Sequence, residues 1–216
     1  MTRKRLCDRI LPIYSQAEDW FNAITHGLGV IVGIVFLMLA VSKQPEIASW
    51  VYGLSMIAVY TVSALYHGWK TGPTKKILQV MDHCTIYTLI AGTYTPILLF
   101  DFIPYAPAAG WGLLAFQWVS CILCILLNIV GLRGFRGISM VFYVLMGWAI
   151  LFVAPYAFRL MHPQGLLFVF LGGVSYTVGA ILYGIGSKKP WFHGIFHLFV
   201  LGGSILQFIG IYRYIL

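Results

Sequence analysis

Hydrophobic residues in this 216-residue chain form long continuous blocks, separated by short clusters of charged and polar positions. Seven stretches contain no charged residue: 20–42, 47–69, 83–100, 102–132, 137–158, 160–187 and 190–212. A helix needs about 20 apolar residues to cross the hydrocarbon core of a bilayer. The third stretch reaches that length only if its helix starts near Ile77 and includes Asp82. Because the blocks are continuous rather than alternating, they predict an all-α bundle of seven transmembrane helices and not a β-barrel.

The composition supports an integral membrane protein. Hydrophobic residues make up 60% of the chain and charged residues 9%, whereas a soluble domain carries about 25% charged residues. The formal net charge of +8 would suggest nucleic acid as a partner of a soluble protein, but here we expect membrane lipids and no nucleic acid. We expect residues 1–19 to form a short cytoplasmic segment and residues 20–216 a single transmembrane domain.

The positions of the basic residues predict the orientation in the membrane. Cytoplasmic loops carry an excess of Lys and Arg. If the chain crosses seven times, one side holds eleven basic residues, and the other holds Lys43, Arg159 and Arg213. The eleven are Arg3, Lys4, Arg5, Arg9, Lys70, Lys75, Lys76, Arg133, Arg136, Lys188 and Lys189. This asymmetry predicts a multi-pass protein of the inner (plasma) membrane, with its N-terminus in the cytoplasm and its C-terminus outside. The first helix would act as an uncleaved insertion signal.

Two histidines near the C-terminus are the strongest functional signal in the sequence. His193 and His197 are four residues apart in an otherwise apolar segment, so both imidazoles lie on one face of the predicted helix. Ionisable side chains inside a membrane helix are costly and indicate a functional site. The same spacing lets one helix provide two nitrogen ligands to one metal ion.

Further polar residues are expected at the same depth. Ser63 and His67 are four residues apart near the end of the second predicted helix, and Asp82 is the one acidic residue within a predicted span. At about 1.5 Å per residue from the nearest lysine, these side chains and the two later histidines lie within about 4–12 Å of the cytoplasmic edge. His67 or His193 alone would be read as an interfacial residue. Together the set predicts a metal site.

The expected metal is zinc. Three neutral imidazoles leave one position of a tetrahedral zinc ion open, and a water there can have its pKa lowered to about 7. Asp82 is then expected to orient that water or a histidine N–H. Ser63 could hydrogen-bond the same water or a substrate oxygen.

A second polar stripe occupies the start of the first predicted helix. Glu18, Asn22 and His26 follow one another at intervals of four residues and share a face. They would either brace this helix against the bundle or line an opening to the metal site, and we favour bracing. Further along, Gly29 and Gly33 form a GxxxG pattern, which we expect to serve helix packing inside the bundle rather than a dimer face.

Five sequence motifs stand out: Glu18-x3-Asn22-x2-Thr25-His26-Gly27, Ser63-x3-His67, Asp82 to Tyr87, Ala91 to Pro96 and His193-x3-His197. Together they resemble the hemolysin III proteins, the bacterial branch of the progestin and adipoQ receptor family. The resemblance covers nearly the whole chain. It implies seven transmembrane helices, a cytoplasmic N-terminus and a zinc ion held by three histidines with an aspartate and a serine nearby. The wider superfamily includes adiponectin receptors and alkaline ceramidases, so the resemblance suggests hydrolysis of lipid amides.

Several functions are compatible with these observations. The first is a zinc-dependent hydrolase of lipid amides or esters in membrane lipid homeostasis, with His67, His193 and His197 as ligands and Asp82 and Ser63 in the reaction. The second is a receptor-like or homeostatic membrane protein whose zinc is structural, and a homo-oligomer is possible. Pore formation ranks low because so few charges leave no wide aqueous lumen. Ion transport ranks low because the polar residues gather at one edge of the membrane.

Overall fold

The computed structural model describes residues 10–131, 135–186 and 189–216, apart from the side chains of residues 135, 136 and 186. All regular structure in these residues is helical, which confirms the predicted all-α class. Of the basic residues used for the orientation, Arg3, Lys4, Arg5, Arg9, Arg133 and Lys188 lie outside the described residues, as does the side chain of Arg136. The elements are α1 (Gln16–Lys43), α2 (Ile47–Gly68), α3 (Pro73–Ile97), η2 (Leu98–Phe102), α4 (Pro107–Val130), α5 (Phe135–Gly147), η3 (Ala149–Val153), α6 (Ala154–Leu160), α7 (Pro163–Gly186) and α8 (Phe192–Tyr214).

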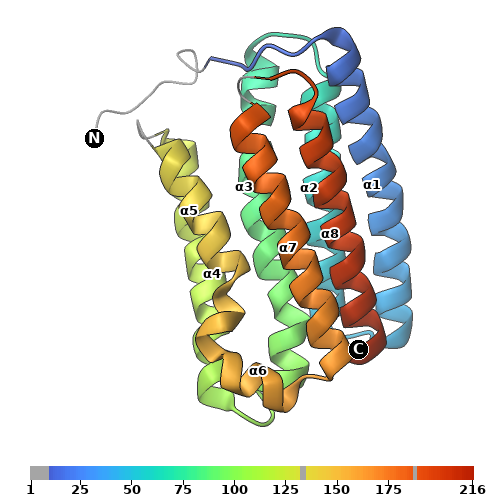
Figure 1. Ribbon diagram of the computed structural model, residues 1–216, viewed down its shortest axis with the longest axis vertical. Helices are drawn as coiled ribbons and strands as arrows, with labels where there is room; N and C mark the ends of the chain where they lie inside the picture. Colours follow the sequence, from blue (N-terminus) through green and yellow to red (C-terminus); the bar gives the residue numbers. More distant parts are fainter. Residues whose placement is uncertain (1–9, 132–134, 187–188) are drawn as a thin grey trace.

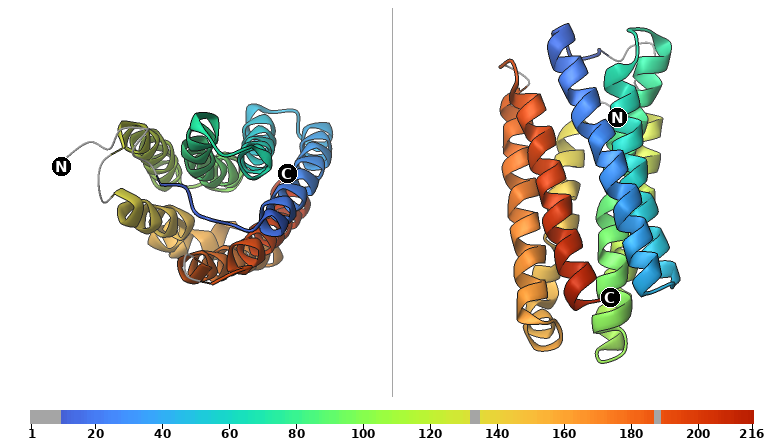
Figure 2. Two further views of the ribbon diagram at one scale, coloured as in Figure 1. Left: turned by 90° about the horizontal axis from the view of Figure 1, so that it is seen from above. Right: turned by 90° about the vertical axis from the view of Figure 1, so that its right-hand side faces the viewer.

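The long helices run side by side along the long axis of the molecule (Figure 1). Neighbours in the chain are neighbours in space from α1 to α4, and α8 packs between α7 and α1. Viewed from one end, the helices surround a central region, and the segment leading into α1 crosses that end (Figure 2). The ring is least tightly joined where α5 meets α7.

The fifth predicted helix is broken, which corrects the expectation of one continuous helix over 137–158. The helical segments Gly137–Gly147 and Ala149–Leu160 meet at an angle of 41°. Gly147 ends α5, and Pro155 stands in the first turn of α6. Proline lacks the backbone N–H that a continuous helix needs, and its ring clashes with the carbonyl group four residues earlier. The break therefore follows from local sequence.

Five helices in the described part of the chain are long and apolar enough to cross a membrane: α1, α2, α4, α7 and α8. The bent pair raises this number to six if it counts as one span. The protein is therefore a multi-pass membrane protein. Helix α3 does not meet the same criterion, because its first half carries Lys75, Lys76, Gln79, Asp82 and His83. Seven spans and their orientation remain predictions.

The distribution of polar side chains is the reverse of that in a soluble protein. Leu28 and Met38 on α1 are more than half exposed, whereas Asn22, Ser63 and Gln117 are almost completely buried. Exposed apolar side chains suit a lipid environment, and buried polar side chains in membrane helices mark sites of function or helix contact. The interior of the bundle is thus the part of the molecule in which to look for chemistry.

The GxxxG pattern of α1 serves packing inside the bundle, as predicted. A Cβ atom added at Gly29 would lie 2.6 Å from the Tyr60 ring, and one added at Gly33 would lie 3.2 Å from Ile57. Both neighbours belong to α2. The two glycines therefore let α1 and α2 approach closely, and this brings the first turns of α1 next to the last turn of α2.

Candidate metal centre

The structure brings His67, His193 and His197 together into one buried cluster. His67 comes from the last turns of α2, and His193 and His197 come from the first two turns of α8. The Nε2 atom of His193 lies 3.2 Å from Nε2 of His67 and 3.1 Å from Nε2 of His197. All three side chains are buried, and each can direct one ligand atom to a common point. We call these three residues the histidine cluster.

Two of the nitrogen–nitrogen distances in the histidine cluster are close to those expected around a tetrahedral metal ion. Zinc–nitrogen bonds of about 2.0–2.1 Å place neighbouring ligand atoms about 3.3–3.4 Å apart, close to the two Nε2–Nε2 distances. Three Nε2 atoms that face one another also form a poor hydrogen-bonded group, because each neutral imidazole has one donor and one acceptor nitrogen. A metal ion satisfies all three lone pairs at once, and three protein ligands leave a fourth position open.

Asp82 and Ser63 lie beside the histidine cluster. Both line the cavity that also contacts His193 and His197. The Ser63 hydroxyl interacts with the Asp82 carboxylate as a hydrogen-bond donor, and Asp82 interacts electrostatically with His67. The layer of polar residues predicted from helix rise alone therefore exists in space, contributed by α2, α3 and α8.

The cavity has a volume of about 660 Å³ and extends well beyond the histidine cluster. It reaches Trp148 and Gln207; from His197 to Gln207 it follows α8 for about 15 Å. Its walls are mainly apolar, including Val59, Ile86 and Leu89. Asp82, His193 and His197 thus lie at one end of a mainly apolar chamber, whose far end carries uncharged polar side chains such as Gln207.

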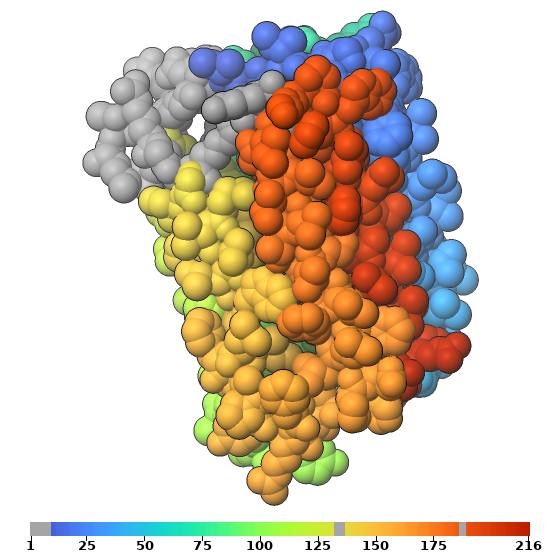
Figure 3. Space-filling view, in the orientation of Figure 1, coloured from blue at the N-terminus to red at the C-terminus, as the bar shows by residue number. Residues whose placement is uncertain are grey.

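A smaller cavity of about 380 Å³ adjoins the first one between η3–α6 and α7. Gly147, Trp148 and Gly173 line both cavities. Figure 3 shows the face on which α5 to α7 meet. The Trp148 indole donates a hydrogen bond to Thr177 Oγ1 at 3.0 Å. Trp148 therefore stands at the junction of the two cavities, held by α7.

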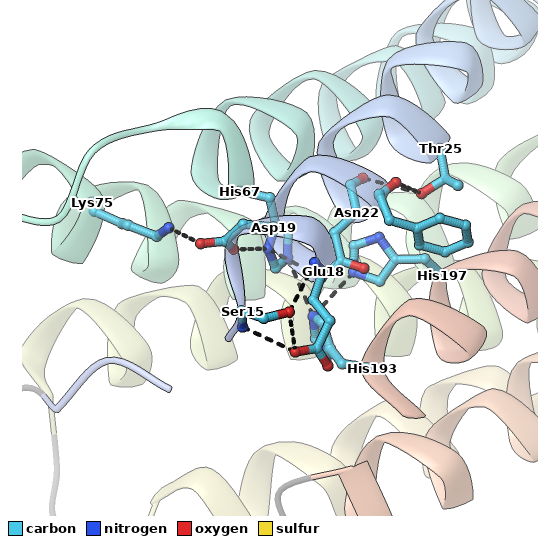
Figure 4. A network of polar contacts seen from close by, with 10 residues as sticks. Ser15, Glu18, Asp19, Asn22, Thr25, His67, Lys75, His193 and His197 are labelled. Atoms are coloured by element: carbon cyan, nitrogen blue, oxygen red, sulfur yellow. Dashed lines mark hydrogen bonds and ion pairs between the residues drawn. The ribbon is translucent and has the colours of Figure 1, made fainter. Parts of the chain in front are cut away.

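The sequence interpretation missed the carboxylate that contacts the histidine cluster. Asp19 Oδ1 lies 3.1 Å from Nδ1 of His67, and Asp19 Oδ2 accepts a bond from Lys75 Nζ at 2.9 Å (Figure 4). Lys75, counted above among the basic residues of the cytoplasmic side, is buried. A signal was available, since Asp19, Asn22 and His26 follow the helical spacing i, i+3, i+7. The predicted polar stripe begins at Glu18 instead of Asp19.

Glu18 connects α1 to the start of α8. Its carboxylate completes a capping box with Ser15, and its Oε1 accepts a hydrogen bond from the Trp191 backbone N–H at 2.6 Å. Trp191 has a positive φ of 66°, uncommon for a residue with a side chain. The Glu18 contact thus holds a strained residue directly before the helix that carries His193 and His197.

Asn22 and His26 also face the histidine cluster. The Asn22 amide nitrogen lies 3.5 Å from His67 Nδ1, and the His26 ring stacks on His197 with centroids 3.7 Å apart. His26 also lines the large cavity. The stripe therefore contacts both α2 and α8, and its last member also reaches the cavity wall; bracing stays a prediction. His162 stacks on Tyr214 at the opposite end of the bundle, apart from the histidine cluster.

Comparison with known proteins identifies the family of this chain. A sequence model of the family described as "Haemolysin-III related" matches residues 14–208. The chain belongs to the haemolysin-III family. The matched segment includes all the site residues named above, so the predicted family membership is confirmed over nearly the whole chain.

Named relatives of this haemolysin-III protein cover most of its length. It is 38% identical to "Hemolysin-3" of Bacillus cereus, over 92% of each chain. It is 37% identical to the "Hemolysin-3 homolog" of Bacillus subtilis (strain 168), over 94% of this chain and 96% of the relative. Human "Monocyte to macrophage differentiation factor" is 26% identical, over 92% of this chain and 84% of the relative. No solved structure matches the chain.

Proposed function

We propose that this haemolysin-III protein is a zinc-dependent hydrolase that cleaves an amide or ester bond of a membrane lipid near the cytoplasmic face. The observation that carries the proposal is the histidine cluster at one end of a mainly apolar cavity, with Asp82 and Ser63 beside it. A lipid substrate has the matching shape, with a polar carbonyl group at one end of an apolar chain. Its acyl chain would occupy the apolar part of the cavity.

The donor set is suited to zinc. His67, His193 and His197 would hold the ion through their Nε2 atoms, since these atoms face one another. When bound, zinc would supply Lewis acidity, which activates a water molecule and polarises a carbonyl oxygen. Imidazole nitrogens alone do not exclude other transition metals, so metal analysis is part of the test.

The remaining chemistry falls to Asp82 and Ser63. Asp82 would accept a proton from the attacking water and return it to the leaving nitrogen or oxygen, so that the carboxylate is regenerated at the end of the cycle. Ser63, which contacts Asp82, would orient the carboxylate or hydrogen-bond the substrate oxygen. Both residues line the cavity, as do His193 and His197.

The proposal is tested by lipid hydrolysis with purified protein. The protein would be reconstituted in vesicles with N-acyl sphingoid amides, N-acyl amines and glycerophospholipid esters, and released fatty acid would be measured by mass spectrometry. We expect the His197→Ala variant to lose both zinc and activity, while His162→Ala, at the far end of the bundle, retains both. Fatty acid release that is the same in wild type and His197→Ala would contradict the proposal.

A structural role for zinc is the second candidate. The histidine cluster joins α2 to α8, and its neighbours Asp19 and Lys75 connect α1 and α3 to the same point. A metal ion there would hold four helix ends together. This role predicts that a chelator lowers the thermal stability of the wild-type protein strongly and of His193→Ala little. A metal-free wild-type protein of unchanged stability would argue against it.

A further inference from the structure

Asp19 and Lys75 form an ion pair beside the histidine cluster, and the chemistry proposed above uses neither residue. Lys75 comes from the first turn of α3 and is only 5% exposed, and Asp19 comes from the first turn of α1. The two carboxylate oxygens of Asp19 have different partners, Lys75 Nζ at 2.9 Å and His67 Nδ1 at 3.1 Å. One carboxylate therefore joins a buried cation to a candidate metal ligand, as Figure 4 shows.

The contact with Asp19 bears on the protonation state of His67. Its Nε2 atom points toward the other two histidines, so a metal ligand role requires an unprotonated Nε2. The proton of the neutral ring must then be on Nδ1. Nδ1 is the atom that faces the Asp19 carboxylate, and a carboxylate can only accept in this bond. Asp19 thus favours the one tautomer of His67 that can bind a metal through Nε2.

Lys75 limits the orientations that Asp19 can adopt. A carboxylate with one partner can rotate, whereas Asp19 is held at both oxygens. Lys75 is itself held, because its ammonium group lies 5.6 Å from the centre of the Tyr66 ring, within the range of a cation–π interaction. Burying a lysine is costly unless it is paired. The chain therefore retains a buried cation whose principal contact is the carboxylate that orients His67.

We propose that Asp19 is a positioning residue for the metal ion and that Lys75 anchors it in this role. Asp19 would align the His67 ring and fix its tautomer, as carboxylates do for metal-bound histidines elsewhere. The assignment rests on the metal-binding part of the proposed function and not on hydrolysis. The two carboxylates of the site then have different roles: Asp19 acts through His67, and Asp82 faces the cavity.

The test is the affinity for zinc alone, measured on the full-length protein by competition with a chelating dye. Asp19→Ala would leave Lys75 buried without its partner, so the decisive variant is the double substitution Asp19→Ala/Lys75→Met, which removes both charges. We expect the double variant to bind zinc about 10–100-fold more weakly than wild type. Asp19→Asn keeps an oxygen that can accept from Nδ1, and its affinity should lie between those of wild type and the double variant.

The absorption spectrum of the cobalt-substituted protein provides a second measurement, which would not change if Asp19 and Lys75 had only a structural role. The visible absorption of Co²⁺ reports ligand geometry, and we expect it to change in the double variant and not in Lys70→Met, a control that removes an exposed lysine from the same end of the bundle. A double variant with wild-type zinc affinity and an unchanged cobalt spectrum would overturn the proposal. If the wild-type protein binds no zinc, both proposals fail; if it binds zinc but hydrolyses no lipid, only the catalytic proposal fails.

Discussion

Asp82 is the residue on which the proposed chemistry most directly depends, because it lies in the cavity and not among the metal ligands. Substitution by Asn preserves its size but removes the ability to accept a proton. General acid–base catalysis contributes about 10²–10⁴-fold to a rate. We therefore expect Asp82→Asn to lower the hydrolysis rate by this factor while zinc content stays at the wild-type level.

Zinc content and fatty acid release should be measured on the same preparation of the Asp82→Asn protein. Ser63→Ala provides a graded comparison, since it removes a hydrogen-bonding partner of Asp82 but keeps the carboxylate. Its rate should lie between those of wild type and Asp82→Asn. Loss of zinc from the Asp82→Asn protein would mean that this carboxylate supports metal binding instead.

Most residues of the candidate site could be predicted from sequence because each is an ionisable group in an apolar segment. His193 and His197 revealed themselves by spacing, and Asp82 by being the one acid in a predicted span. Asp19 could not be found in the same way. It stands in the polar first turn of α1, where acidic residues are common because they favour the positive end of the helix dipole. The helical spacing to Asn22 and His26 was the one available signal, and the packing of α1 on α2 shows the contact of Asp19 with His67.

Helix packing within the bundle makes a prediction at the level of the element. Gly29 faces the ring of Tyr60, a fully buried residue whose hydroxyl donates to Ser204 on α8 at 2.6 Å. A larger residue at Gly29 would separate α1 from α2 and disturb this contact. We expect Gly29→Leu to lower the free energy of unfolding by about 1–3 kcal/mol, the usual cost of overpacking.

Gly27 is the matched control for this substitution. It lies two residues earlier on α1, and an added Cβ atom there would meet nothing within 4 Å. Thermal stability in detergent should therefore fall for Gly29→Leu and change little for Gly27→Leu. Equal losses for the two variants would show that α1 is sensitive to any large side chain and that close approach to α2 is not the cause.

The junction between the two cavities gives a second prediction at this level. Gly173 on α7 faces Trp148, and an added Cβ atom would lie 3.5 Å from the indole ring, an ordinary contact distance. A leucine side chain at Gly173 should therefore fill the junction without disrupting the helix. If a long acyl chain passes from the large cavity into the smaller one, Gly173→Leu should reduce hydrolysis of long-chain substrates more than that of short-chain ones.

The selectivity of Gly173→Leu is measured as the ratio of rates for two lipids with the same head group and different acyl lengths. Gly184→Leu serves as the control, because Gly184 is on the same helix and an added Cβ atom there would meet nothing within 4 Å. An unchanged ratio in Gly173→Leu would confine the substrate to the large cavity.

Hydropathy predicted most helix boundaries well and two features poorly. The stretches 47–69 and 190–212 correspond to α2 and α8 within a few residues, because a continuous apolar block is an unambiguous signal. The break between α5 and α6 depends on Gly147 and Pro155, which a count of charges does not register. Helix α3 is the second feature that hydropathy predicts poorly, because it carries several charged and polar residues. Gln79, Asp82 and His83 line the cavity and Lys75 pairs with α1, so composition alone does not decide whether α3 crosses the membrane.

At the scale of the whole molecule, the open question is whether α3 crosses the membrane. Its 25 residues span about 37 Å at 1.5 Å per residue, longer than the hydrocarbon core of about 30 Å. It packs between α2 and α4, both apolar enough to be spans. Its polar residues include Asp82 and Lys75, which face the cavity and Asp19, as expected for polar groups inside a membrane bundle. We therefore expect α3 to be a span, which makes seven with the bent pair.

The two ends of α3 provide the test of this topology. Lys70 and Tyr105 are exposed residues that flank α3–η2, so seven spans with a cytoplasmic N-terminus place Lys70 inside and Tyr105 outside. In a variant without the native cysteines, Tyr105→Cys should react with a membrane-impermeant maleimide in intact cells, whereas Lys70→Cys should react only after permeabilisation. If both positions are labelled from the same side, α3 does not cross. The asymmetry of basic residues would then need an explanation that does not require α3 to cross the membrane. A chain that turns back at α3 places Arg159 and Arg213 on the side now assigned to the cytoplasm.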